Sequence, residues 1–186
     1  MVDIERRALV APASPAKIVG RRRPTEKGRE VTYDSMDRGR YVVPALGSLY
    51  TALEAYSWLL VRAATGLFFI PHGMQKLFGF WGGDIVKTAE GFAKQGLNPS
   101  MFWAYYIGCL EVFGGLCLVL GLLTRPVAAL FAGFMFVAAF HVHMPIGWFW
   151  NARGMELPLY LLPICLAILI RGGGPLSLDR RLGREI

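Results

Sequence analysis

Long runs of apolar residues after residue 54 constrain this chain more than any other feature of its sequence. Residues 55–79 contain two charged side chains, residues 101–123 contain one, and residues 126–144 contain none. At about 1.5 Å per residue, each run is long enough to cross a hydrocarbon layer of roughly 30 Å. With 54% hydrophobic residues, the chain is too apolar for an ordinary soluble domain.

A fourth apolar run is shorter and contains Pro158 and Pro163. Such a segment can still span a membrane if neighbouring helices support a kink or if the bilayer is thin at that point. We therefore predict an all-α fold, a four-transmembrane-helix bundle that makes up residues 46–179. The predicted spans are about 55–79, 101–123, 126–144 and 156–170.

Residues 1–45 have the opposite character and are predicted to form a basic, flexible, Pro-containing arm. This segment is rich in arginine and has little apolar surface to bury. The favoured interpretation is a positively charged tail that sets membrane topology and is attracted to anionic lipid; the alternative is an arm that folds against a partner subunit. Nucleic-acid binding is disfavoured, because no aromatic platform or helix-turn-helix pattern accompanies the charge.

The distribution of lysine and arginine predicts that both termini are cytoplasmic. With four spans, the arm, the turn at residues 124–126 and the basic tail at 180–186 lie on one side of the membrane, which is the side expected to carry the positive charge. Four of the five tryptophans fall near the opposite interface, where indole rings are favoured. Residues 176–186 alternate leucine with charge and are predicted to lie along the inner membrane surface.

Charged residues inside the spans are the main candidates for function, since each costs at least about 2.5 kcal/mol in hydrocarbon unless it meets a partner or water. On the first span, Arg62, His72 and Lys76 fall on one helical face. On the second span, Glu111 lies beside several glycines that allow another helix to approach. We therefore predict that Glu111 faces Arg62 or Lys76, either as a salt bridge that fixes helix register or as part of a ligand or proton site.

Further polar residues cluster at the outer ends of the spans and predict a pocket in the outer half of the bundle. Glu111 and His72 are the catalytic candidates. The candidate ligand-binding residues are Arg62, His72, Lys76, Glu111, His141 and Glu156.

The spacing of the histidines and cysteines along the chain gives little support for a metal site or for thiol chemistry. His141 and His143 are two residues apart and would point in nearly opposite directions on a helix, so no metal site is assigned. A haem held by His72 and His141 is a lesser alternative. The three cysteines form no CxxC pair and are predicted to be small buried core residues: Cys109, Cys117 and Cys165.

Several short motifs in order along residues 59–179 resemble the DoxX family of bacterial membrane proteins. They are an arginine-led first span, HGMQKL at 72–77, EVFGG at 111–115, LGLLTR at 120–125, a histidine at the end of the third span and GPLSLD at 174–179. The resemblance implies a four-helix bundle in the bacterial inner membrane. Relatives include a subunit of thiosulfate:quinone oxidoreductase and proteins linked to redox and oxidative-stress complexes. The arm before Tyr41 lies outside the family pattern.

Two functions of different classes follow from these residues and this resemblance. The first is a quinone-interacting membrane subunit of an oxidoreductase complex, in which His72 or Lys76 hydrogen-bonds a quinone carbonyl and Glu111 relays protons. The wall of the quinone ring would come from Phe68, Phe69 and Trp103. The second is a non-catalytic membrane anchor or assembly subunit that recruits a soluble partner, so whether the chain is itself an enzyme is left open.

Overall fold

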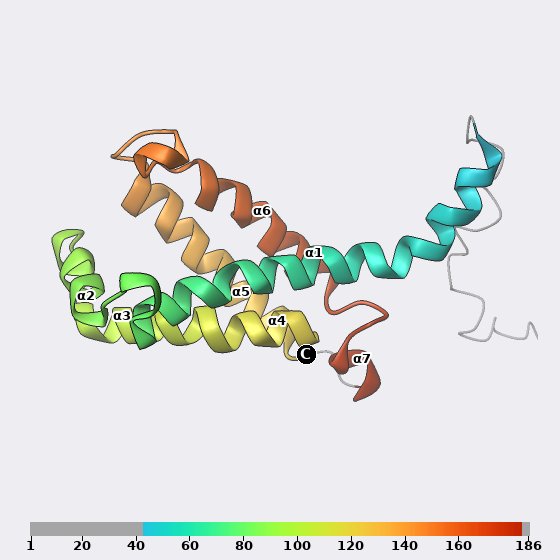
Figure 1. Cartoon of the computed structure of the whole chain (residues 1–186), viewed down its shortest axis with the longest axis horizontal. Helices are drawn as coiled ribbons and strands as arrows, with labels where there is room; N and C mark the ends of the chain where they lie inside the picture. Colours follow the sequence, from blue (N-terminus) through green and yellow to red (C-terminus); the bar gives the residue numbers. More distant parts are fainter. Residues whose placement is uncertain (1–42, 184–186) are drawn as a thin grey trace, which may run out of the picture. The chain divides into compact units, whose positions relative to one another are not determined.

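The computed structural model describes residues 43–183, and its regular secondary structure is entirely helical (Figure 1). The prediction of an all-α fold is thereby confirmed for this part of the chain. Residues 1–42, which include almost all of the predicted arm, lie outside the described residues. The four apolar runs form four helical segments: α1 (Pro44–Phe78); α3 (Ser100–Cys109), a π-helical turn (Leu110–Gly114) and α4 (Gly115–Leu120); α5 (Thr124–Val137) and a second π-helical turn (Ala138–His143); and α6 (Glu156–Arg171).

Three of these segments are long and apolar enough to cross a membrane, and they match the first three predicted spans. Their candidate spans are Leu46–Phe78, Ser100–Leu120 and Thr124–His143. The first helix begins at Pro44 rather than near residue 55, because the apolar helical pattern continues toward the N-terminus. α6 has 16 residues and is about 24 Å long, which is shorter than a typical hydrocarbon layer.

Local sequence signals explain where the shorter elements begin and end. The side chain of Asp84 accepts a hydrogen bond from the Val86 backbone N–H at 2.7 Å and caps α2 (Ile85–Lys94). α3 begins at Ser100, directly after Pro99 and close to residue 101, where the second predicted span starts. α6 ends at Arg171, and the glycine that follows it, Gly172, has a φ of 80°, which is strained for residues with a side chain.

α1 and the α3–α4 segment approach each other closely at two pairs of glycines. A Cβ atom on Gly73 would lie 2.7 Å from the carbonyl oxygen of Gly108, and one on Gly115 would lie 2.8 Å from that of Gly66. Real Cβ atoms do not come so close to backbone. Glycine at these positions therefore allows the two membrane helices to pack backbone against backbone.

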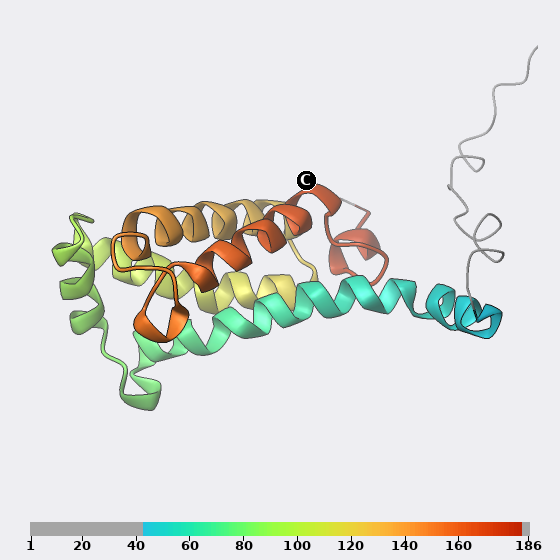
Figure 2. The same cartoon turned by 90° about the horizontal axis from the view of Figure 1, so that it is seen from above.

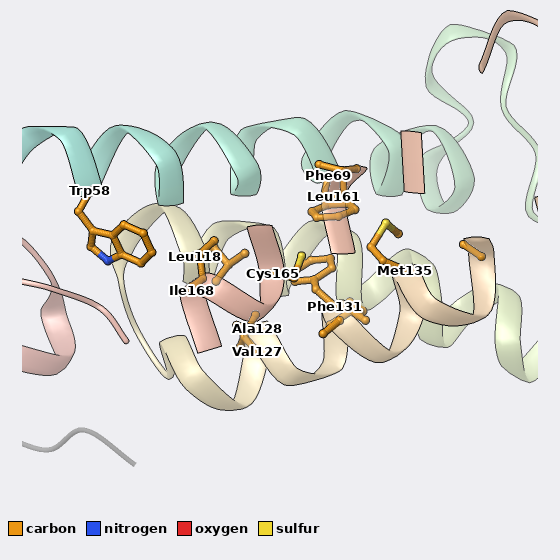
Figure 3. Close-up of a cluster of buried hydrophobic side chains, with 13 residues drawn as sticks. Trp58, Phe69, Leu118, Val127, Ala128, Phe131, Met135, Leu161, Cys165 and Ile168 are labelled. Carbon is orange, nitrogen blue, oxygen red and sulfur yellow. The ribbon is translucent and has the colours of Figure 1, made fainter. Parts of the chain in front are cut away.

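α5 and α6 pack along each other and form the second helix pair (Figure 2). The two pairs diverge toward the end of the bundle that carries α2 (Figure 1). A buried apolar core joins the pairs (Figure 3). In it, the ring of Phe69 from α1 stacks on that of Phe131 from α5 with centroids 4.1 Å apart. The other fully buried apolar side chains of this core are Leu118, Ala128, Cys165 and Ile168.

The described part of the C-terminal segment packs against the bundle through two buried polar residues, and the location of residues 176–186 along the inner membrane surface stays a prediction. Ser177 and Asp179 are buried; Ser177 caps the short helix α7 (Leu178–Arg181), and Asp179 lies in its first turn. The carboxylate of Asp179 accepts hydrogen bonds from the backbone N–H groups of Leu123 at 2.7 Å and Thr124 at 2.9 Å. Asp179, which is distant in sequence, thus caps the start of α5. The N-cap residue of that helix, Leu123, has no side-chain acceptor and cannot do so.

Candidate functional site

Lys76 and Glu111 form an ion pair between α1 and the α3–α4 segment. The Lys76 Nζ atom lies 2.6 Å from Oε2 and 2.8 Å from Oε1 of Glu111. The Glu111 side chain is 4% exposed and that of Lys76 is 20% exposed. Gly73 and Gly108, each one helical turn before a member of the pair, bring the two backbones close enough for it. The predicted contact between Glu111 and the basic face of the first span is confirmed, with Lys76 as the partner.

Glu111 belongs to the first of two π-helical turns, Leu110–Gly114 and Ala138–His143. A π turn adds a residue to the helical repeat and rotates the side chains before it relative to those after it. Turns of this kind are frequent at functional sites. Both π turns supply side chains to the same cavity.

That cavity, which we call the central cavity, lies between the two diverging helix pairs and has a volume of about 640 Å³. Its charged and imidazole side chains are the Lys76–Glu111 pair, His72 and His143, and the aromatic lining adds the indole N–H of Trp103 and the hydroxyl of Tyr106. The remaining lining is largely aromatic and aliphatic, and comes from all four helical segments. It includes Phe68 and Phe69 of α1, Trp103 and Tyr106 of α3, Phe134 of α5, and Leu157, Pro158 and Leu161 of α6.

The structure brings together part of the predicted site. His72 lines the central cavity, is exposed, and has its ring centroid 5.0 Å from that of Phe68. Phe68, Phe69 and Trp103, the side chains expected to form a ring wall, also line it. For α1, helical spacing alone therefore identified residues that line the cavity, such as Phe69 and His72.

Arg62 does not reach the central cavity, although it shares the predicted face. It lies 14 residues before Lys76, or about 21 Å along the helix, and is fully buried against the C-terminal segment. Its Nη2 atom donates to the Leu176 carbonyl oxygen at 2.7 Å. Gly121 faces the guanidinium, and a Cβ atom at that position would collide with it. Arg62 is thus placed to hold the tail, at the opposite end of the bundle from the pair.

His141 and His143 each contact a backbone carbonyl of a connecting loop. The Nε2 atom of His141 lies 2.9 Å from the Gln95 oxygen, and the Nδ1 atom of His143 lies 2.6 Å from the Arg153 oxygen. His143, which was not a predicted site residue, lines the central cavity, whereas His141 does not. The structure therefore does not bring His72 and His141 to one cavity, as a shared haem would require.

Glu156 lines a second pocket and not the central cavity. Its Oε2 atom accepts a hydrogen bond from the Trp150 backbone N–H at 3.1 Å, and the two residues line this pocket with Leu157 and Tyr160. Among the residues missed from sequence, Tyr106 had a usable signal, since it lies three residues after Trp103 and therefore on the same face of the helix. Phe134 and His143 had none, because their position depends on how α5 packs.

Metal-binding groups and cysteines are dispersed. Within residues 43–183, no three His, Cys, Asp or Glu side chains come together in a way that could hold a metal ion. Cys165 is buried, Cys117 is partly buried and Cys109 is exposed. The prediction of three buried cysteines is therefore wrong for Cys109, which lies on the outer face of α3.

Comparison with known proteins places this geometry in a family. The DoxX family profile matches residues 57–144. A Bacillus subtilis protein named "Putative oxidoreductase CatD" is 36% identical over 121 residues, which cover 65% of this chain and 83% of that protein. Two Escherichia coli proteins named inner membrane proteins are also similar: YphA is 31% identical, covering 66% of this chain and 88% of its own, and YqjF is 30% identical, covering 72% and 97%. No solved structure shows a significant match to the chain.

Proposed function

This chain belongs to the DoxX family of bacterial inner-membrane proteins, and from that premise we propose that it is the membrane subunit of a quinone-linked oxidoreductase complex. The quinone headgroup would occupy the central cavity. The observation that carries this proposal is the Lys76–Glu111 pair, which places a hydrogen-bond donor and an ionisable acid against the aromatic lining of a cavity inside membrane-crossing helices. The similarity to a protein named as an oxidoreductase supports the redox assignment.

The proposal includes a topology of four spans with both termini in the cytoplasm. α6 would be the fourth span, supported by its packing along α5 and by a composition with no charge between Glu156 and Arg171. The basic residues of the arm and of the C-terminal segment then share the cytoplasmic side. This orientation puts the central cavity in the outer half of the bundle, since it lies at the end that carries α2.

The cavity lining fits a quinone headgroup in both shape and hydrogen bonding. Aromatic side chains on α1 and α3 can pack against a flat ring. An ammonium group has three donors, and two of those on Lys76 point to the Glu111 carboxylate. The third has only a long contact of 3.4 Å with the His72 carbonyl oxygen, so it is available to donate to a quinone carbonyl.

A bound quinone would supply the redox chemistry, taking up two electrons from a redox partner protein and two protons to become a quinol. Glu111 would hold a proton beside the carbonyl that Lys76 hydrogen-bonds. His72, which lines the cavity and is also exposed, would exchange protons between the cavity and its surroundings. The partner subunit and the substrate that donates the electrons lie outside this chain.

A second candidate function is a non-catalytic anchor or assembly subunit. It is favoured by one observation: the Lys76–Glu111 pair satisfies its own charges through two short hydrogen bonds, as a purely structural pair does. In that case the pair would serve only to fix the register of two membrane helices, and a soluble partner would bind elsewhere.

Replacing Glu111 with Gln in the assembled complex separates these functions. This change keeps the size of the side chain and removes its ability to carry a proton. We expect quinone-linked turnover to fall by about two orders of magnitude, the usual contribution of a positioned acid or base, while the complex stays assembled. The matched control is Glu90→Gln on α2, an exposed glutamate outside the cavity, which is expected to leave turnover unchanged.

The anchor function makes the opposite prediction for the same variant. Turnover per assembled complex would be unchanged by Glu111→Gln, and any loss of activity would follow the loss of assembled complex. Measuring both quantities on the same membranes, by quinone reduction and by co-purification of the partner subunits, therefore decides between the two.

A further inference from the structure

The central cavity reaches the surface of the bundle between α3 and α5. Five residues there both line the cavity and are exposed: Tyr106 on α3, and Ala129, Leu130, Gly133 and Val137 on α5. The four residues on α5 follow helical spacing, so they form one continuous edge. We call these five residues the lateral edge.

Gly133 leaves the middle of the lateral edge open. A side chain placed at Gly133 would meet no atom within 4 Å, although the glycine lies within a membrane helix. The glycines that bring α1 against the α3–α4 segment behave differently, since a side chain at Gly73 or Gly115 would collide with the facing helix. Gly133 is therefore not explained by helix packing.

The lateral edge is uncharged and belongs to helices that are long and apolar enough to cross a membrane. Its α5 residues lie near the middle of the candidate span Thr124–His143, Tyr106 lies in the candidate span Ser100–Leu120, and none of its five residues is charged. Another exposed part of the cavity lining is more polar, because it includes the imidazole of His72 on α1. The cavity thus has an apolar opening at membrane depth and a polar group on another side.

We infer, building on the proposed function, that the ligand of the central cavity is a quinone with a long polyisoprenoid chain, and that this chain leaves the cavity over Gly133. The headgroup reaches the Lys76–Glu111 pair from the bilayer, between α3 and α5. At the lateral edge the polyisoprenoid chain needs space more than it needs binding contacts. Lipid is as apolar as the lateral edge, so moving the chain from lipid onto this edge gains little free energy. Gly133 supplies that room.

The test measures equilibrium binding of quinone probes to the full chain in lipid nanodiscs, with quenching of tryptophan fluorescence as the readout. Two probes are compared: a polyisoprenoid benzoquinone, and the same headgroup with a methyl group in place of the tail. The variant Gly133→Leu fills the opening. Gly91→Leu on α2 is the matched control, because a side chain at this helical glycine also meets no atom within 4 Å and Gly91 does not line the cavity.

We expect the wild type and Gly91→Leu to bind both probes. Gly133→Leu should weaken binding of the tailed quinone about tenfold and change binding of the tail-free headgroup by less than about twofold. Leu130→Phe narrows the same edge without altering a glycine and should act in the same direction, which keeps the test valid if Gly133→Leu does not fold.

Three results would overturn the inference in distinguishable ways. If both edge variants bind the tailed quinone as the wild type does, the tail leaves elsewhere while the proposed function stands. If they weaken both probes equally, the edge is part of the headgroup site and no separate path exists for the tail. If the wild type binds neither probe, the proposed function fails and the inference fails with it.

Discussion

The Lys76–Glu111 pair predicts strong energetic coupling between α1 and the α3–α4 segment. Glu111→Gln removes the negative charge, Lys76→Met removes the positive charge at nearly constant length, and the double variant removes both. The two charges are in direct contact, with N–O distances of 2.6 and 2.8 Å. Residues in such contact usually show coupling energies of about 0.5–3 kcal/mol.

The burial of each partner sets the expected magnitudes. Lys76→Met strands a carboxylate that is only 4% exposed, so we expect a loss of stability of about 3–5 kcal/mol, as for other broken buried pairs. Glu111→Gln should cost less, about 2 kcal/mol, because Lys76 is 20% exposed and its long side chain can turn into the cavity. The double variant leaves no stranded charge, so the coupling energy should be about 2 kcal/mol.

The assay is unfolding of the full chain in detergent or nanodiscs, with all four proteins of the cycle measured under the same conditions. A second cycle, pairing Glu111→Gln with Arg62→Met, is the control. Arg62 hydrogen-bonds the C-terminal segment about 21 Å away along α1, so these changes should add within about 0.5 kcal/mol. Coupling below about 0.5 kcal/mol for Lys76 and Glu111, or equal coupling in both cycles, would refute the assignment of the pair.

Three further predictions follow from other parts of the bundle. Asp179→Ala removes the acceptor of two backbone hydrogen bonds at the start of α5 and should lower stability by about 1–2 kcal/mol, measured by thermal unfolding against Asp179→Asn, which keeps one acceptor oxygen. Gly73→Ala should lower stability by about 1–3 kcal/mol, because its Cβ atom would meet the facing backbone. Gly91→Ala should be neutral or stabilising by up to about 1 kcal/mol, and a greater loss of stability for Gly91→Ala than for Gly73→Ala would contradict the glycine contact. A membrane-permeant thiol reagent should modify the exposed Cys109 well before the buried Cys165, and mass spectrometry of the digested protein would show which thiol reacts first.

The sequence by itself determined the class of fold, because the length and apolar character of a membrane helix are local properties. Runs of about 20 apolar residues can satisfy their backbone in lipid only as helices. The three long apolar helices and the bounds of α6, predicted at 156–170, could be placed for this reason. Helical spacing on a single segment was also enough to assign His72 and Lys76 to one face and to identify Glu111 as the acid that faces it.

Only the tertiary structure decided which basic residue of α1 pairs with Glu111 and what the other basic residue on the same helical face contacts. Lys76 and Arg62 lie on the same stripe of α1, and spacing cannot distinguish them, because the choice depends on how far the second segment slides along the first. The contact of Gly73 with Gly108 sets that slide and brings Lys76 to the acid, while Arg62 meets the folded-back tail. The lateral edge at Gly133 has the same origin: the angle between two helix pairs opens a cavity there, and such an angle arises from packing among segments distant in sequence.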